Sequence, residues 1–175
     1  MTNSGELAWR DADQAVWQAA VDGEVLLPHV YLHPGQIYVA TAPAVVNTIL
    51  GSCVSVCLWS PEFAIGGINH YLLPTGAKTS PAALRYGNLA IELLVAKLIQ
   101  VGGRPGGLQA KVFGGACVLD AMRGKEIHLG TKNVEIATRA LATAGIPVIA
   151  SDVGGNRGRK LVFRPHDGSA LVKLL

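Results

Sequence analysis

Short apolar runs separated by turn-forming residues dominate the pattern of hydrophobic and polar positions along the chain. Apolar runs of this length, bounded by glycine, proline, asparagine or aspartate, are typical of β-strands. The pattern predicts strands at Gln36–Ala40, Val54–Trp59, Ala64–Leu72, Lys111–Phe113, Val148–Asp152, Lys160–Arg164 and Ala170–Leu174. The last two strands are expected to pair as a hairpin, because the Asp167-Gly168 dipeptide between them is a favoured turn sequence.

Three other segments show the periodicity of helices. Tyr86–Val101 is the clearest and ends at a glycine pair, Thr131–Ala144 ends at Gly145, and Asp11–Val21 has the pattern of a short amphipathic helix. The inward face of the helix at 131–144 is expected to carry Val134, Ala137, Leu141 and Ala144. The order of strands, helix, strand, helix and strands favours an α+β layered fold over a doubly wound parallel sheet.

The composition is that of one globular domain. Of the 175 residues, 50% are apolar and 15% are charged, which allows a hydrophobic core and argues against extensive disorder. We expect residues 1–27 to form an N-terminal extension and residues 28–175 to form the domain.

Charge and cysteine content narrow the class of protein further. The net charge is +3, and the basic cluster Arg157-Gly-Arg159-Lys160 is interpreted as a solvated strand end rather than a nucleic-acid site. Three cysteines do not predict a disulfide framework. The first residues lack the features of a signal peptide, and no apolar stretch reaches the ~20 residues that span a bilayer. We therefore expect a cytoplasmic protein that does not insert into membranes.

The positions of Cys53 and His70 in the sequence suggest that a thiol and an imidazole lie close together. Cys53 leaves a Gly51-Ser52 loop and opens an apolar run, and His70 lies in the next apolar run. If Pro61 and Glu62 are the central residues of the intervening turn, Cys53 and His70 lie directly opposite each other in a hairpin. This pair is the minimum for cysteine nucleophilic catalysis, with an imidazole that lowers the thiol pKa and loop N–H groups that stabilise an oxyanion. The alternative is that both are ordinary core side chains.

A zinc site is the competing chemistry for the same residues. Cys53, Cys57 and His70 would supply three ligands, but no fourth ligand is placed to complete a structural site. Cys57 and Cys117 are therefore interpreted as small core residues. The chain also lacks a phosphate-binding glycine loop, so we expect no cofactor and no metal. The remaining histidines are assigned to the surface or to loops: His29, His33, His128 and His166.

Six motifs occur together in one order along roughly residues 35–170. They are Leu50-Gly-Ser-Cys-Val54, Gly67-Ile-Asn-His-Tyr-Leu-Leu-Pro74, Arg85-Tyr-Gly87, Lys111-Val-Phe-Gly-Gly-Ala116, Gly130-Thr-Lys-Asn133 and Asp152-Val-Gly-Gly-Asn-Arg-Gly-Arg-Lys160. In their sequence and order these motifs resemble the CheD family, the chemoreceptor glutamine deamidases of bacterial and archaeal chemotaxis. The resemblance implies a fold similar to that of the cytotoxic necrotizing factor deamidases, a β-sandwich-like core with flanking helices.

The resemblance also implies the residues of the site. Cys53 matches the nucleophile and His70 the catalytic histidine, and Thr48 is carried over as the third residue. The preceding position, Asn47, is the alternative for that third role. Backbone N–H groups near Gly51 and Ser52 would hold the oxyanion.

The implied reaction is hydrolysis of glutamine side chains of chemoreceptors, the methyl-accepting chemotaxis proteins, to glutamate and ammonia through a Cys53 thioester. The implied partners are the cytoplasmic helices of the receptors and a CheC-type phosphatase, and the implied location is the chemoreceptor array. The alternative function is that of a non-catalytic adaptor that binds receptors and the phosphatase.

Overall fold

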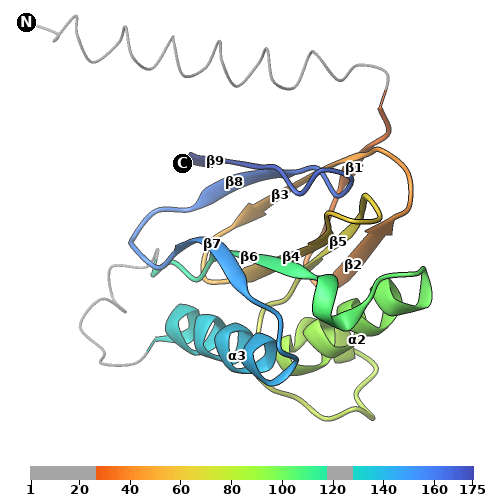
Figure 1. Cartoon of the computed structure of the whole chain (residues 1–175). Helices are drawn as coiled ribbons and strands as arrows, with labels where there is room; N and C mark the ends of the chain where they lie inside the picture. The colour runs from red at the N-terminus through yellow and green to blue at the C-terminus, as the bar shows by residue number, and fades with distance from the viewer. Residues whose placement is uncertain (1–26, 118–127) are drawn as a thin grey trace, which may run out of the picture.

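The computed structural model describes residues 27–117 and 128–175. In this part of the chain, nine strands form two sheets and two α-helices lie beside them (Figure 1). The four-stranded sheet has the order β1-β3-β8-β9, in which β1 runs parallel to β3 and the other pairs are antiparallel. Its strands are β1 (His29–Tyr31), β3 (Val45–Leu50), β8 (Arg159–Phe163) and β9 (Ala170–Leu174).

The five-stranded sheet has the order β2-β5-β4-β6-β7, with a parallel pair only between β6 and β7. Its strands are β2 (Gln36–Ala40), β4 (Val54–Ser60), β5 (Ile65–His70), β6 (Gln109–Gly114) and β7 (Val148–Val153). The helices are α2 (Gly87–Gln100) and α3 (Leu129–Thr143), and two short 3₁₀ turns are η1 (Ala83–Arg85) and η2 (Pro105–Gly107).

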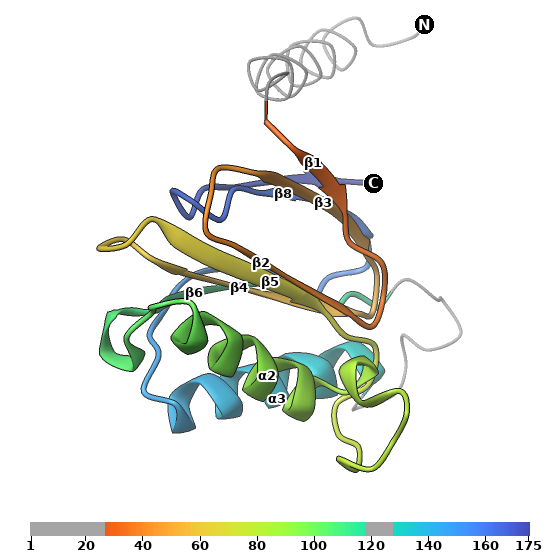
Figure 2. The ribbon, with the colours of Figure 1, turned by 90° about the vertical axis from the view of Figure 1, so that its right-hand side faces the viewer.

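The elements stack in three layers. Figure 2 shows the four-stranded sheet on one side of the five-stranded sheet and both helices on the other. Strand β4 lies at the centre and is buried on both faces. Because side chains alternate along a strand, Val54, Val56 and Leu58 pack toward α2 and α3, whereas Cys57 and Trp59 pack in the core between the two sheets. The predicted α+β fold with a β-sandwich-like core and flanking helices is thereby confirmed.

The strands that the sequence did not predict are β1 and β3. Strand β3 (Val45–Leu50) lacks a clean alternation of exposed and buried positions, because both of its first two valines are buried, in different apolar clusters. The predicted helix at Asp11–Val21 lies outside the described residues, and the extension at 1–27 with the boundary at residue 28 stays a prediction.

Helix α3 differs from its prediction in the residues it buries. Ala137 and Leu141 are buried as expected, but Val134 is half-buried and Ala144 is exposed. A further fully buried position of this helix is polar, Asn133. Hydrophobic periodicity does not predict that an asparagine is buried, because burying its amide is favourable only with hydrogen-bond partners that the tertiary structure supplies.

The basic cluster at 157–160 is only partly the solvated strand end that the sequence predicted, because Arg157 is exposed but Arg159 is buried. Arg159 on β8 is 4% exposed, and its guanidinium contacts Asp152 Oδ1 on β7 with Nε and Nη2 both at 2.8 Å. This ion pair joins the edge strand of the five-stranded sheet to the four-stranded sheet. A buried arginine needs such a partner, and the partner lies on another strand.

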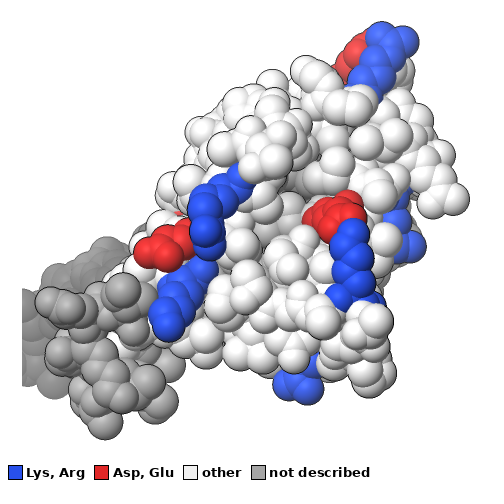
Figure 3. All heavy atoms as spheres, turned by 90° about the horizontal axis from the view of Figure 1, so that it is seen from below, with Lys and Arg blue, Asp and Glu red and all other residues white. Residues whose placement is uncertain are grey.

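The helix layer carries scattered charge. Figure 3 views the molecule from the helix side and shows Lys and Arg side chains separated by uncharged surface rather than gathered into one basic patch on this face. No helix in the described ranges is long and apolar enough to cross a membrane.

Candidate active site

Two of the sequence-predicted site residues, Thr48 and His70, meet across the two sheets, and Cys53 lies in the connection where the chain crosses from one sheet to the other. Thr48 lies on β3 of the four-stranded sheet, and His70 is the last residue of β5 in the five-stranded sheet. Cys53 lies in the short connection between β3 and β4, which joins the two sheets. The connection is short enough that the thiol must stay near the edge of the inter-sheet core, where Cys53 is half-buried.

The register of the β4–β5 hairpin differs from the prediction by two residues. Leu58 pairs with Gly67, and Val54 pairs with Tyr71, so the position opposite His70 is Ser55 rather than Cys53. The hairpin loop is longer than a two-residue turn, since all of 61–64 lies outside the strands and Ala64 adopts a positive φ of 52°. A shift of two residues preserves the face of the sheet, so Cys53 and His70 remain diagonal neighbours on the inter-sheet side.

A hydrogen-bonded chain defines the state of the His70 ring. Thr48 Oγ1 donates to Leu32 O at 2.8 Å and lies 2.9 Å from His70 Nδ1. A hydroxyl has one proton, so when Thr48 donates it to the carbonyl, its oxygen must accept from Nδ1–H of the imidazole. The ring is therefore the Nδ1–H tautomer, and its Nε2 carries a lone pair. Nε2 is buried and has no protein partner among the described residues, which leaves it available as a base.

The alternative third residue, Asn47, has a different setting. It precedes Thr48 on β3, so its side chain points to the opposite face of that strand, and it is half-buried. Its carbonyl oxygen accepts the N–H of Leu32 at 2.8 Å and helps to hold the segment that carries the acceptor for Thr48. Of the two candidates, the geometry brings Thr48 to the imidazole.

The strand pairing is modified beside His70. The N–H of Val56 donates to the side-chain Oδ1 of Asn69 at 2.9 Å, where a regular ladder would use the main-chain carbonyl. Regular pairing resumes on either side, at Val54–Tyr71 and Cys57–Ile68. The irregularity lies directly next to the Ser55–His70 position, so the β4–β5 ladder is locally interrupted at the histidine.

Burial controls the ionisation of both groups. Desolvation lowers the pKa of His70 to about 4, so the imidazole is neutral at pH 7. Burial also raises the pKa of the Cys53 thiol, partly offset by its own backbone N–H and by the positive charge of Arg85. The expectation that a neighbouring imidazole lowers the thiol pKa is therefore wrong for the free protein. The resting pair is a thiol and a neutral base.

The loop that carries Cys53 is held by its carbonyl groups. Ala116 N–H donates to Gly51 O and Gly115 N–H donates to Cys53 O, both at 2.8 Å. From the other side, Asn133 Nδ2 on α3 donates to Ser52 O at 2.9 Å. Three successive carbonyls thus have donors, and these contacts restrain the backbone on which the thiol is carried.

Asn133 also ties this loop to the end of the histidine strand. The same Nδ2 donates to Leu72 O at 2.9 Å, and the backbone carbonyl of Asn133 accepts the hydroxyl of Tyr71. One fully buried amide therefore links α3, the Cys53 loop and the residues that follow His70. In the sequence, Asn133 belongs to the Gly130–Asn133 motif without an assigned role; the signal that could identify it is an asparagine at an otherwise inward position in the first turns of a helix.

The glycine pair after β6 makes room for this arrangement. A Cβ on Gly114 would lie 2.2 Å from Cys53 O, and its φ of +106° is one that only glycine adopts readily. A Cβ on Gly130 of α3 would lie 2.2 Å from Gly115 O. Gly114, Gly115 and Gly130 therefore let three backbone segments approach one another closely enough to support the Cys53 loop.

The other cysteines are not part of this arrangement. Cys57 is fully buried in the inter-sheet apolar cluster, as expected, and burial raises its pKa strongly. Cys117, expected in the core, is half-buried instead. Among the described residues, no group of three His, Cys, Asp or Glu side chains is arranged to hold a metal ion.

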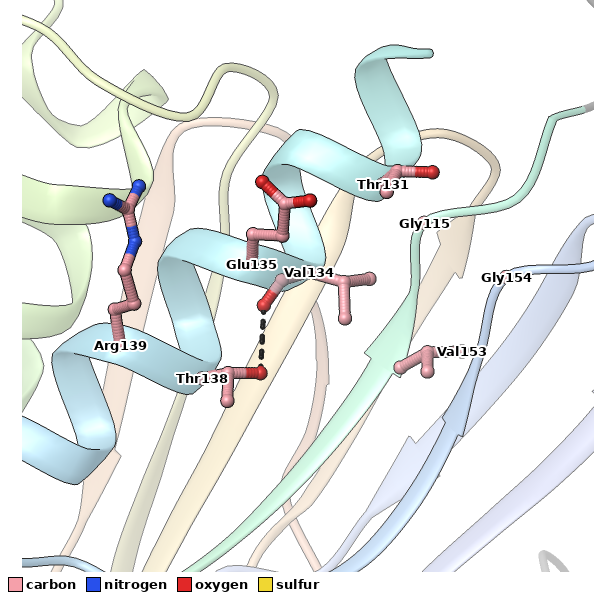
Figure 4. A pocket seen from close by; sticks show the side chains of 8 residues that line it. All are labelled: Gly115, Thr131, Val134, Glu135, Thr138, Arg139, Val153 and Gly154. Atoms are coloured by element: carbon pink, nitrogen blue, oxygen red, sulfur yellow. Dashed lines mark hydrogen bonds between the residues drawn. The ribbon is translucent and has the colours of Figure 1, made fainter. Parts of the chain in front are cut away.

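A hollow of about 520 Å³ lies between α3 and the ends of β6 and β7 (Figure 4). Its lining comes from α3 and from the segments after β6 and β7: Gly115, Thr131, Val134, Glu135, Thr138, Arg139, Val153 and Gly154. A second hollow lies between α2 and α3. Neither is lined by Cys53 or His70. These two hollows are therefore separate from the candidate site.

The polar segment at 74–81, predicted as an exposed loop next to the site, is largely exposed but anchored. Gly76 N–H donates to Asn88 Oδ1 at 3.1 Å, and Asn88 Nδ2 returns a bond to Gly76 O at 3.2 Å. Lys78 and Glu92 form an ion pair at 2.6 Å. The loop therefore has a defined course from the end of β5 to η1, which brings Arg85 back beside the site.

Comparisons with known proteins agree with this architecture. A family model described as "CheD chemotactic sensory transduction" matches residues 72–174. A protein of Anaeromyxobacter dehalogenans named "Probable chemoreceptor glutamine deamidase CheD 1" is 50% identical over 146 residues, which is 83% of this chain and 84% of that protein. A protein of Sulfurimonas denitrificans named "Probable chemoreceptor glutamine deamidase CheD" is 40% identical over 143 residues, 82% of this chain and 92% of that protein.

A similar fold occurs in a solved structure of low sequence identity. The hypothetical protein YfiH of Bacillus licheniformis superimposes with a TM-score of 0.51 and 15% identity, covering 78% of this chain and 67% of that one. At this identity the likeness concerns the fold alone, which is a related layered arrangement of sheets and helices.

Proposed function

The chain belongs to the CheD family, and from that premise we propose that it is a protein-glutamine deamidase that converts glutamines of chemoreceptors to glutamate with release of ammonia. The observation that supports this most directly is the Leu32–Thr48–His70 chain of hydrogen bonds. It presents Nε2 as an unpartnered base on the face of the sheet that also carries Cys53. The relatives described above are named for this same reaction.

The first half-reaction forms a thioester. His70 Nε2 takes the proton of Cys53 as Sγ attacks the carboxamide carbon of the glutamine. The imidazolium then gives that proton to the nitrogen of the tetrahedral intermediate, and the C–N bond breaks to release NH₃. Because desolvation holds the pKa of His70 at about 4, the imidazolium is a strong acid for this step once it has formed.

The second half-reaction consumes water. His70 Nε2 removes a proton from the water as its oxygen attacks the thioester carbonyl, and the intermediate collapses to a carboxyl group with return of the proton to Cys53 Sγ. The balance is one glutamine side chain plus one water to one glutamate plus one ammonia. Each turnover adds one negative charge to the receptor.

Backbone N–H groups of the Cys53 loop are the proposed oxyanion donors. In a trans peptide the C=O of one residue and the N–H of the next point in opposite directions, and the described chain has no cis peptide bonds. Since Gly51 O and Ser52 O are bonded to Ala116 and Asn133, the N–H groups of Ser52 and Cys53 point away from these anchors. N–H groups fixed in this way can meet an oxyanion without rearranging.

The proposed substrate also implies where the protein acts and which proteins it binds. We propose that the protein acts in the cytoplasm at receptor arrays and that a CheC-type phosphatase is a further binding partner. An adaptor without catalysis is the other candidate, but such a protein has no use for a buried imidazole held in one tautomer beside a half-buried thiol.

The test is ammonia release from a receptor cytoplasmic fragment, with mass spectrometry of its glutamine peptides. The native protein should produce ammonia and a gain of about 1 Da at specific glutamines, because OH replaces NH₂. Cys53→Ala should remain folded and abolish both signals, whereas Cys57→Ala, which removes a thiol from the same face of β4, should retain them. A Cys53→Ala protein with full activity would exclude the thioester mechanism.

A further inference from the structure

Arg85 is a positively charged residue whose backbone is bonded to the residues that follow His70. It is the last residue of η1, directly before α2, and its charge favours the ionised form of Cys53. The imidazole cannot supply this charge, because His70 is 2% exposed and neutral at pH 7, with a pKa of about 4. A thiolate in a half-buried position needs a nearby positive charge, so the electrostatic role that an imidazolium has in many cysteine enzymes falls to another residue here.

The backbone of Arg85 is fixed against the strand end that carries the histidine. Its carbonyl oxygen accepts the N–H of Leu72 at 2.9 Å and of Leu73 at 3.0 Å. Leu72 is also one of the two residues whose carbonyls share the amide of Asn133, and the other is Ser52, next to the nucleophile. Arg85 is thus attached, through one intermediate residue, to the same support that holds the Cys53 loop.

The side chain of Arg85 runs alongside Gly35. A Cβ built on Gly35 would lie 3.1 Å from Arg85 Cγ, so the aliphatic part of the arginine runs along this glycine. Gly35 N–H in turn donates to His70 O at 2.7 Å. The arginine stem therefore lies against the residue that is bonded to the histidine backbone.

Arg85 is an exposed residue, and among residues 27–117 and 128–175 no carboxylate forms an ion pair with its guanidinium. The groups that hold the Cys53 loop are uncharged: the Asn133 amide on α3 and the N–H groups of Gly115 and Ala116. Arg159, which lies opposite Leu50 at the start of the connection, is paired with Asp152. The charge of Arg85 is therefore available to the nucleophile.

We propose that Arg85 is a positioning residue for the reaction, whose guanidinium stabilises the negative charge that develops on Cys53 Sγ. This inference rests on the proposed function only for its role in turnover, since it concerns the reactivity of the thiol itself. The base and the cation are then different residues: His70 takes the proton of Cys53, and Arg85 stabilises the negative charge on Sγ.

The test is the rate of Cys53 alkylation by iodoacetamide as a function of pH, followed by peptide mass spectrometry without any substrate. In Arg85→Gln the profile should move to higher pH, so that the rate near pH 7.5 falls about threefold to tenfold while the alkaline plateau stays unchanged. Arg85→Lys should restore most of the native rate, because it keeps the charge. Added salt should slow the native protein more than Arg85→Gln, since an exposed charge is screened.

Two further variants make the result decisive. Arg104→Gln removes another exposed arginine, which forms an ion pair with Glu62. This control should leave the pH profile of Cys53 alkylation unchanged. His70→Asn removes the imidazole, and a profile that responds to His70→Asn but not to Arg85→Gln would overturn the inference. If the native protein releases no ammonia but Arg85→Gln still slows alkylation of Cys53, the deamidase proposal is rejected. The inferred effect of Arg85 on the thiol is then retained.

Discussion

Thr48 Oγ1 lies 2.9 Å from His70 Nδ1, and this hydrogen bond joins the two sheets beside the loop that carries Cys53. Many catalytic histidines are oriented by a carboxylate, which also stabilises the protonated ring. A threonine hydroxyl orients the ring without adding a negative charge. This difference explains how the imidazole can be held in one tautomer and still remain neutral in a buried setting.

Removing the Thr48 hydroxyl should impair catalysis more than folding. Thr48→Val leaves Leu32 O and His70 Nδ1–H without partners, which should lower the free energy of unfolding by about 1–3 kcal/mol. The ring then loses its orientation, and kcat for ammonia release should fall about tenfold to hundredfold. Urea denaturation and steady-state kinetics measure the two effects.

Thr48→Ser and Asn47→Ala are the matched controls. The serine keeps the hydroxyl and should retain most of the activity, and Asn47→Ala removes a side chain from the opposite face of the same strand. If Asn47→Ala lowers kcat more than Thr48→Val does, the third position belongs to Asn47.

The buried neutral histidine should make stability depend on pH. The folded-state pKa of His70 is about 4, below the ordinary value of 6.5, so the unfolded chain binds the proton more readily. Stability from this source is present above pH 6.5 and is lost as the pH falls toward 4. Between pH 7.5 and pH 5 the loss should be about 2 kcal/mol. Urea denaturation of the native protein at both values, compared with His70→Asn, isolates this contribution, and an identical pH dependence in the two proteins would contradict it.

Gly114 should tolerate no side chain. Gly114→Ala introduces a Cβ that would lie 2.2 Å from Cys53 O, in addition to a positive φ. Gly102→Ala is a close match, because Gly102 has nearly the same φ of +107° and no atom within 4 Å of a built Cβ. The Gly102 variant should show only the backbone penalty, about 1–2 kcal/mol. The Gly114 variant should lose more and should also lose ammonia release, as the carbonyl of Cys53 is displaced; equal thermal midpoints for the two variants would argue against this close approach.

Asn133 should be needed for both stability and activity. Asn133→Ala removes the donor shared by Ser52 O and Leu72 O, and two under-satisfied carbonyls should lower the free energy of unfolding by about 2–4 kcal/mol. The Cys53 loop then loses one of its anchors, so kcat should fall in the protein that remains folded at low temperature. Asn88→Ala removes a comparable clamp on Gly76, away from Cys53, and should be milder in both respects. A greater loss of activity in the Asn88 variant would speak against the assigned role of Asn133.

Local sequence was sufficient for much of the fold. Helices α2 and α3 were predicted to within about two residues of their observed ends, because their periodicity and terminal glycines are local signals. The β8–β9 hairpin likewise follows from two short apolar runs around an Asp-Gly turn. The alternation along β4 and β5 also placed Cys53 and His70 on one face, and this conclusion survived an error of two residues in the register.

What the sequence by itself determined is the period of each element and the two reactive residue types that its turns bring near each other. The tertiary structure alone decided that Thr48 on one sheet bonds His70 on the other, and that Asn133 is buried to hold the Cys53 loop. It also decided that the imidazole is neutral, since burial and partners across the sandwich set a pKa. These relationships join residues that are far apart in the chain, and local hydropathy carries no information about such pairs.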